Sequence, residues 1–305
     1  MLADPLLTVI IVSWNVRDLL VACLRSLQAD LERAGPPADI WVVDNGSTDG
    51  TPEVVARDFP AVRLIARRDN PGFAAANNQA MHAALETAPP RYFWLLNPDT
   101  QLLPGATAAL IAAMEAYPRV GVAGAKLLYP DGSLQHSAFR FPGLVQLVFD
   151  LFSLPPRLYE TRLNGRYPSR LYNGESPFFV DHPLGAAMMV RKEAVEQVGL
   201  LDEGYRIYCE EIDWCWRMRR AGWRALCVPA AQVVHHAGCS TGQVPVSSFI
   251  HLWTSRARLY ARHHGPVTRC LARTLVRIGM RRRRRGATPE GQEAIQQVLR
   301  AWEDL

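Results

Sequence analysis

A regular alternation of short apolar runs with helix-length segments over the first 117 residues constrains the fold more than any other feature. The apolar runs are rich in β-branched or aromatic residues and are too short for helices, so they predict buried strands. These predicted strands lie at 6–14, 39–45, 61–67 and 91–97. Helices are predicted at 15–33, 47–59, 72–86 and 104–117. Strands that alternate with helices in this way predict a mostly parallel sheet with right-handed crossovers, and therefore an α/β fold.

Each of the four predicted strands runs into polar, turn-forming residues. These ends carry Ser13–Asn15, Asp44–Ser47, Asp69–Gly72 and Asn97–Asp99. In open α/β sheets, ligands bind just beyond the carboxyl ends of the strands. We therefore expect these four ends to lie along one edge of the sheet and to form a ligand site there.

The later part of the chain is less regular. Residues 129–178 are rich in proline, glycine, tyrosine and phenylalanine, which predicts loops and short helices lying over the site. A helix is predicted from Lys192 to Val198, and another from about Glu210 to Ala221 that ends at Gly222 and leads into a strand.

Cysteine usage and terminal sequence restrict the class of protein. The six cysteines form no CxxC pair, which argues against a zinc ribbon or a disulfide framework and favours a reduced, cytoplasmic compartment. The first residues are apolar but lack a basic region and a small-residue cleavage site, so they predict a strand rather than a signal peptide. No apolar run approaches the roughly 18 residues of a membrane span.

Positive charge is concentrated near the C-terminus. Residues 214–289 contain fifteen arginines and no acidic residue, so this region should face an anionic partner. Residues 266–280 place apolar side chains at helical spacing, and five arginines follow at 281–285. The apolar side chains are those of Val267, Cys270, Leu271, Leu275 and Ile278. A basic amphipathic helix is typical of a membrane-surface segment.

Two other interpretations of this basic region stay open. It could be a packed or solvated terminal helix, or it could bind nucleic acid. A nucleic-acid partner is not expected, because no aromatic-interleaved platform or DNA-reading motif accompanies the arginines.

Several polar residues have both a structural and a chemical interpretation. Asp44 could form a local turn, or it could accept a hydrogen bond from a nucleotide base or ribose. Asp99 could ligate a divalent cation, whereas it is badly spaced to cap a helix that begins near Pro104. Around Gly72, the segment NPGFAAANNQA supplies uncharged hydrogen-bonding groups, but it matches neither a dinucleotide-binding nor a P-loop motif.

A cluster of acids and a pair of histidines follow later in the chain. The segment EEID at 210–213 places three carboxylates at a predicted helix start. Acids there stabilise the helix dipole, yet their crowding also raises carboxylate pKa values, which suits a general base. His235 and His236 follow a predicted strand, and either could be structural or a ligand.

The ordered set of motifs resembles a known family. The chain contains, in this order, IIVSWN, VVDNGSTDG, NPGFAAANN, LLNPDT, GAAMMVRKEA, GLLDEGY, EEIDWCWRMRRAGW and VVHHAGCST. Over about residues 7–241 this set resembles the family 2 glycosyltransferases of GT-A fold, especially the rhamnosyltransferase-like branch. The resemblance implies a GT-A domain at 1–245, followed by a basic amphipathic helical segment at 246–305.

The resemblance also implies roles for individual residues. The implied donor-binding residues are Ser13, Asp44, Asn70, Gly72, Asn77, Asn97, Asp99, Gly185 and Ala186. LLNPDT corresponds to a metal motif that is often D-x-D, so Asp99 would be the sole carboxylate ligand, with His235, or else His236, as a further ligand. The EEIDWCWR motif implies that Glu211 is the catalytic base, and the alternative is that Glu210 shares the role.

The activity implied by the resemblance is that of an inverting glycosyltransferase that uses Mg²⁺ or Mn²⁺. It would move a sugar, with rhamnose from dTDP-rhamnose favoured, to a hydroxyl of a glycan or lipid-linked acceptor in cell-surface polysaccharide synthesis. Such an enzyme would work in the cytoplasm, with peripheral attachment to the inner face of the membrane.

Two other functions are alternatives to that of a glycosyltransferase. A sugar nucleotidyltransferase would need a glycine-rich basic loop after the first strand, and VSWNVRD lacks one. A non-catalytic membrane-surface protein with a degenerate GT-A core is the second alternative.

Overall fold

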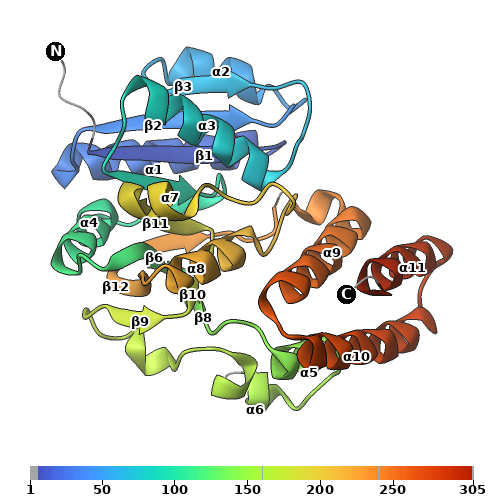
Figure 1. The fold of residues 1–305 in the computed structure, drawn as a ribbon. Helices are drawn as coiled ribbons and strands as arrows, with labels where there is room; N and C mark the ends of the chain where they lie inside the picture. Colours follow the sequence, from blue (N-terminus) through green and yellow to red (C-terminus); the bar gives the residue numbers. More distant parts are fainter. Residues whose placement is uncertain (1–5, 160, 240, 304–305) are drawn as a thin grey trace.

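The computed structural model describes residues 6–159, 161–239 and 241–303, and its centre is a ten-stranded sheet (Figure 1). The strands of this sheet are β1 (Leu7–Ser13), β2 (Ala38–Asp44), β3 (Arg63–Ala66), β4 (Tyr92–Leu96), β5 (Thr100–Leu102), β6 (Val120–Leu128), β7 (Leu134–Gln135), β9 (Phe178–Val180), β11 (Ala187–Arg191) and β12 (Arg224–His235). The main strand order is β3-β2-β1-β4-β11-β6-β12-β5, with β7 on β6 and β9 on β12.

The first four strands pair in parallel, as the alternating sequence predicts. They are connected by α1 (Arg17–Ala34), α2 (Thr51–Asp58) and α3 (Phe73–Thr87), and α4 (Ala106–Ala116) leads from β5 into β6. Strand β11 then enters antiparallel between β4 and β6, and β12 returns parallel to β6. The predicted α/β fold with a mostly parallel sheet is therefore confirmed.

Successive side chains of β1 point to opposite faces of the sheet, and the core accordingly has two layers. Val9 and Ile11 pack on the side covered by α1 and α4, whereas Ile10 and Val12 pack on the side covered by α3, α7 (Lys192–Val198) and α8 (Glu210–Arg220). Each large apolar side chain that is fully buried contributes about 1.5–3 kcal/mol. A sheet covered on both faces leaves only the ends of its strands available for polar chemistry.

The predicted helix at 47–59 begins later than expected. Helix α2 starts at Thr51, because residues 47–50 form a turn in which the Ser47 N–H donates to Asp44 Oδ2 at 2.9 Å. Gly50 completes that turn with a φ of 84°, in the left-handed region. The helix predicted at 192–198 has the expected bounds.

Residues 129–178 contain short elements, as predicted. These include β8 (Ala138–Phe139), α5 (Leu144–Leu151), α6 (Pro156–Tyr159), η1 (Arg162–Asn164) and η2 (Ser169–Leu171). Strand β8 pairs with β10 (His182–Pro183) in a second, two-stranded sheet.

The C-terminal part is a helical layer beside the sheet, made of α9 (Pro245–His263), α10 (Pro266–Arg284) and α11 (Pro289–Glu303), after the short η3 (Thr241–Gln243) (Figure 1). These three helices and α5 share a core that includes Trp253 and Trp302. Most of the five-arginine run belongs to α10, which is longer than the 266–280 segment that we predicted. A domain boundary near residue 245 stays a prediction, and α5 joins the helical layer from earlier in the chain.

No helix in the described part of the chain has both the length and the apolar character that a membrane crossing requires.

Candidate active site

Two neighbouring strand ends present unpaired polar atoms at one edge of the sheet. Ser13 of β1 lies in register with Asp44 of β2. Asp44 uses Oδ2 to accept the Ser47 N–H, but its Oδ1 and the Ser13 hydroxyl are buried without a hydrogen-bond partner among the described residues. A buried unpaired polar group costs about 1–3 kcal/mol. These two atoms are therefore suited to contact a polar ligand, such as a nucleotide.

The loop between β3 and α3 is held against the segment before α8. Gly72 has a φ of 101°, and a Cβ atom there would lie 2.1 Å from the Arg206 carbonyl oxygen, so only glycine fits. The Phe73 N–H donates to that carbonyl at 2.7 Å. Asn70 Oδ1 accepts the Gly72 N–H at 3.1 Å, which braces the loop from within.

The two asparagines of α3 differ in what they contact. Both ends of the Asn78 side-chain amide are hydrogen-bonded. Its Nδ2 donates to the Leu201 carbonyl, and its Oδ1 accepts the Leu201 N–H. Asn77 donates to the Phe73 carbonyl at 2.9 Å, whereas its Oδ1 is buried with no partner in the described chain. Asn77 thus has an acceptor left for a ligand, and Asn78 is a structural link.

Asp99 and His235 come together at the end of β12. His235 Nε2 lies 3.3 Å from Asp99 Oδ1 and 3.5 Å from Asn97 Nδ2. His235 Nδ1 lies 2.8 Å from Gln135 Oε1, and because an amide oxygen only accepts, Nδ1 carries the proton in this arrangement. Nε2 faces Asp99 Oδ1, so a cation bound by the neutral imidazole at Nε2 would also meet the carboxylate. An imidazole oriented in this way by a neighbouring acceptor is typical of a metal ligand.

The pair fits a divalent cation only in part. In the described residues, no group of three or more His, Cys, Asp or Glu side chains could hold a metal. Asp99 and His235 would supply one oxygen and one nitrogen, which Mn²⁺ accepts, and the diphosphate of a donor would supply further oxygens. His236 is placed differently: its backbone N–H donates to the Asp99 carbonyl at 3.0 Å.

Helix capping does not explain Asp99. Helix α4 is capped instead by Asp30 of α1, whose carboxylate accepts from the backbone N–H groups of Gly105 and Thr107. Asp30 and Thr107 are 77 residues apart in sequence, so no local pattern could reveal this cap.

Two glutamates begin α8 directly after a strained segment; Glu210 is buried, whereas Glu211 is partly exposed. The residues before them, Tyr208 and Cys209, have φ values of 70° and 67°, which are costly for residues other than glycine. Burial and the neighbouring charge of Glu211 raise the pKa of Glu210 well above its ordinary value. Burial raises the pKa of Glu211 to about 7. Glu211 is thereby matched to general-base chemistry near neutral pH.

Gly185, which precedes β11, lies directly against Glu211. A Cβ atom on Gly185 would lie 3.5 Å from Cβ and Cγ of Glu211. The next residue, Ala186, uses its carbonyl to accept the Asn97 N–H at 2.8 Å. The segment 185–186 therefore connects the loop of Asp99 with the side chain of Glu211.

Asp213 has a different role from the other acids of α8. Its Oδ2 accepts from Arg217 Nε at 2.7 Å, and its Oδ1 lies 2.7 Å from Nε2 of His263 on α9. Burial opposes ionisation of Asp213, but these hydrogen bonds outweigh it and lower its pKa. Asp213 thus fixes α8 to the C-terminal layer.

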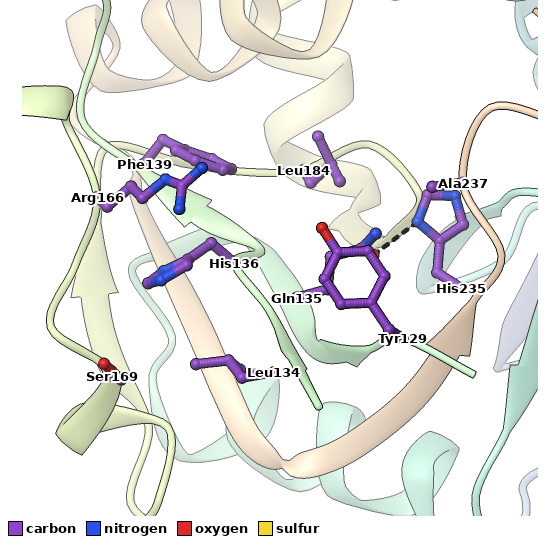
Figure 2. A pocket seen from close by; sticks show the side chains of 10 residues that line it. All are labelled: Tyr129, Leu134, Gln135, His136, Phe139, Arg166, Ser169, Leu184, His235 and Ala237. Carbon is purple, nitrogen blue, oxygen red and sulfur yellow. Dashed lines mark hydrogen bonds between the residues drawn. The ribbon is translucent and has the colours of Figure 1, made fainter. Parts of the chain in front are cut away.

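A cavity of about 500 Å³ adjoins His235 (Figure 2). The residues that line it are Tyr129, Leu134, Gln135, His136, Phe139, Arg166, Ser169, Leu184, His235 and Ala237. Sequence reasoning identified only His235 in this set. The others belong mostly to the irregular region 129–178, where no motif marked them.

Comparisons with known proteins identify the family of the chain. Residues 8–199 match glycosyl transferase family 2. The N-acetylglucosaminyl-diphospho-decaprenol L-rhamnosyltransferase of Mycobacterium tuberculosis is 33% identical over 307 aligned positions, which cover 92% of this chain and 95% of that protein. The rhamnosyltransferase WbbL of Escherichia coli K12 is 43% identical over 58 residues, which cover 19% of this chain and 22% of that protein.

Two solved structures share the fold. GalNAc-T7, bound to UDP, GalNAc and Mn²⁺, superposes with a TM-score of 0.63 at 16% identity and covers all of this chain, which spans 55% of that protein. The mannosyltransferase PcManGT of Pyrobaculum calidifontis, in complex with GDP-Man and Mn²⁺, has a TM-score of 0.57 at 15% identity and covers 99% of this chain and 87% of that protein. The chain therefore has the GT-A fold, belongs to glycosyl transferase family 2 and is a rhamnosyltransferase-like glycosyltransferase.

Proposed function

We propose that the protein transfers rhamnose, with inversion, from dTDP-rhamnose to a hydroxyl group of a lipid-linked sugar acceptor. The observation that carries this proposal is the similarity to a named L-rhamnosyltransferase over 92% of the chain. The site supports it, because it combines unpaired acceptors at one strand edge, a carboxylate–imidazole pair and a glutamate with a raised pKa.

In the proposed mechanism, Glu211 is the base. Its carboxylate takes the proton of the acceptor hydroxyl while that oxygen attacks the anomeric carbon. The bond from that carbon to the nucleotide diphosphate breaks on the opposite face, so the configuration inverts. A divalent cation held by Asp99 and His235 would neutralise the charge of the leaving diphosphate. Burial and the charge of Glu211 raise the pKa of Glu210 well above its ordinary value, which favours Glu211 as the member of the pair that ionises.

The donor nucleotide would lie along the ends of β1 and β2. Asp44 Oδ1 is an acceptor suited to a base N–H or a sugar hydroxyl, and the Ser13 hydroxyl can donate or accept beside it. The loop at Asn70 and Gly72 would bound the nucleotide on its other side. Asn77 Oδ1 adds one further acceptor nearby in α3.

Activity tests this proposal directly. The purified protein would be incubated with Mn²⁺ or Mg²⁺, a panel of nucleotide sugars and a short-chain N-acetylglucosaminyl diphosphate lipid. We expect transfer from dTDP-rhamnose and release of dTDP, with the linkage determined by NMR. Transfer of another sugar would contradict the donor, and retention of anomeric configuration would contradict the mechanism.

We further propose that α10 contacts an anionic membrane surface on the inner face of the cell membrane. Its Ala272, Val276 and Met280 pack inward. On the opposite side, Val267 and Ile278 remain 73% and 52% exposed. The apolar face that the sequence predicts is therefore mostly the outward one, and a different set of residues packs into the core.

The outward apolar residues of α10, which include Leu271, are flanked by arginines. Arg277, Arg281 and Arg282 are exposed on the same helix. Apolar side chains set among arginines suit the interface of an anionic bilayer, where each basic residue contributes about 1 kcal/mol.

Vesicle binding tests this contact. Leu271→Glu should reduce co-flotation with phosphatidylglycerol vesicles several-fold, whereas Leu163→Glu, at another exposed leucine outside α10, should not. Equal binding of the wild type to neutral and anionic vesicles would contradict the electrostatic part of the proposal.

A further inference from the structure

Tyr129 is an exposed aromatic residue that follows β6 and lies next to the histidine of the candidate site. Leu128 of β6 is in register with Val234 of β12, and Tyr129 and His235 are the next residues along these two parallel strands. Gln135, whose Oε1 lies 2.8 Å from His235 Nδ1, belongs to β7, which pairs with β6. Figure 2 shows the ring of Tyr129 beside Gln135 and His235 in the lining of the cavity. The ring of Tyr129 is therefore part of the same site as His235.

A tight turn between β6 and β7 fixes the backbone of Tyr129. The sequence YPDGS at 129–133 has the proline, aspartate and glycine that such a turn favours, and Gly132 has a φ of 81°. The Gly132 N–H donates to the Tyr129 carbonyl at 2.9 Å, and the Tyr129 N–H donates to the Ser133 carbonyl at 2.9 Å. Asp131 Oδ1 accepts the Ser133 N–H at 2.9 Å and braces the turn from within. The side chain of Tyr129 nevertheless stays 44% exposed, so the turn presents a fixed ring to the cavity.

In the order of the strands, Tyr129 lies between the proposed base and the carboxylate–imidazole pair. The sheet runs β4, β11, β6, β12 at this point. Strand β11 is antiparallel to its neighbours, so Gly185, which precedes it, is at the same edge as the ends of β6 and β12. Gly185 lies against Glu211, and His235 faces Asp99. The acceptor hydroxyl has to reach both the base and the anomeric carbon, so the acceptor must enter between these two groups.

The cavity beside Tyr129 extends away from the strand ends where the donor nucleotide would lie. Those ends belong to β1 and β2, which are on the other side of β4 and β11 from Tyr129. The cavity, of about 500 Å³, instead reaches residues of the irregular region, such as Phe139 and Ser169. Its position therefore suits the acceptor rather than the nucleotide. A rigid, flat ring with an exposed face can pack against the C–H groups on one face of a sugar ring.

We propose that the ring of Tyr129 packs against the sugar ring of the acceptor and is a specificity-determining residue for it. The proposal rests on the proposed transfer to a lipid-linked sugar and names the contact by which the enzyme recognises that sugar. The flat apolar face of the ring supplies the contact, and the hydroxyl does not. Phenylalanine should therefore replace Tyr129, whereas alanine and leucine should not.

Steady-state kinetics with farnesyl N-acetylglucosaminyl diphosphate as the acceptor tests the assignment. For Tyr129→Ala we expect KM for the acceptor to rise about tenfold, while KM for dTDP-rhamnose stays within about twofold. Tyr129→Phe should keep both values within about twofold of the wild type, and Tyr129→Leu should resemble Tyr129→Ala. The matched control is Tyr117→Ala, which removes a tyrosine that is 36% exposed directly after α4 and should change neither KM. An equal rise in both KM values, an equal effect of Tyr117→Ala, or no recovery in Tyr129→Phe would overturn the proposal.

A binding measurement separates this assignment from the proposed activity. Without donor or added metal, calorimetric titration with farnesyl N-acetylglucosaminyl diphosphate should show about tenfold weaker binding to Tyr129→Ala than to the wild type or Tyr129→Phe. Farnesyl diphosphate, which lacks the sugar, should bind all three proteins alike, and thermal melting curves check that each variant folds. Unchanged binding to Tyr129→Ala, no binding to the wild type, or the same loss with farnesyl diphosphate overturns the assignment, even if transfer occurs. A loss that depends on the sugar and is restored by Tyr129→Phe supports it, even if dTDP-rhamnose proves to be the wrong donor.

Discussion

The carboxylates at the strand ends and those at the start of α8 are the same chemical group in opposite surroundings. Asp44 accepts a backbone N–H, and Asp99 faces an imidazole. Glu210 Oε2 instead has no hydrogen-bond partner among the described residues; burial raises the pKa of both Glu210 and Glu211, and the charge of Glu211 raises that of Glu210 further. In the proposed reaction, this contrast suits the first two acids to contact ligands and Glu211 to take up a proton.

The largest expected effect comes from removing the base. Glu211→Gln keeps the shape of the side chain but cannot accept a proton, so kcat should fall by about 10²–10⁴. The matched variant is Glu210→Gln, which should retain kcat within about tenfold if Glu211 alone is the base. Initial rates with dTDP-rhamnose measure both. A larger loss in Glu210→Gln than in Glu211→Gln would reverse the roles of the two residues.

The next largest effect concerns Gln135, which orients His235 beside Asp99. Gln135→Leu removes the acceptor that orients His235 and should weaken Mn²⁺ binding about tenfold to hundredfold. Titration of Mn²⁺ in the presence of dTDP, followed by electron paramagnetic resonance, measures it without any turnover. His236→Gln is the control, and an equal loss there would show that our choice between the two histidines is wrong.

The pH dependence of the reaction should reflect the raised pKa of Glu211. Below about pH 7, Glu211 becomes protonated and cannot act as a base, so kcat/KM should fall as pH decreases through that value. At pH 6 we expect about a tenfold loss relative to the alkaline plateau. A profile that stays flat between pH 5.5 and 8 would argue against a glutamate base with this pKa.

The smallest effect is on stability. The pKa of Glu210 is raised in the folded state above its ordinary value of 4.5, so folding is most favourable below that pH and loses free energy as pH rises. Glu210→Gln replaces this titrating carboxyl with a neutral amide and should raise Tm at pH 8 by about 2–4 °C, or roughly 1 kcal/mol. Differential scanning calorimetry should show this gain disappearing near pH 4. A gain that is the same at both pH values would exclude ionisation of Glu210 as its cause.

The fold and the polar ends of its first strands could be predicted, because both depend on short, local sequence patterns. An apolar run that ends in polar residues indicates both a buried strand and a candidate ligand site at its end, as at Asp44 and Asp99. Gln135 and Arg166 could not be found in this way. Gln135 meets His235 from 100 positions away, and Arg166 is placed by a bridge to Phe139 in a region without periodicity.

The sequence pattern alone also could not show which helix residues face the core and which face solvent. In α10 the apolar face predicted from the sequence is mostly exposed, whereas Ala272, Val276 and Met280, which that prediction did not include, pack into the helical core. Asp213 shares the acidic motif of α8 with Glu211, yet it pairs with Arg217 and His263. Which acid becomes structural depends on α9, 50 residues further along the chain.

The link between Asp213 and His263 has a consequence for protein engineering. A chimera could exchange the C-terminal helices in order to direct the enzyme to a different surface. It would then also replace His263, the partner of the buried Asp213 carboxylate in α8. Losing one partner of such a pair costs about 3–5 kcal/mol. A graft that begins after His263 keeps the pair intact, whereas one that begins before α9 must supply an equivalent histidine.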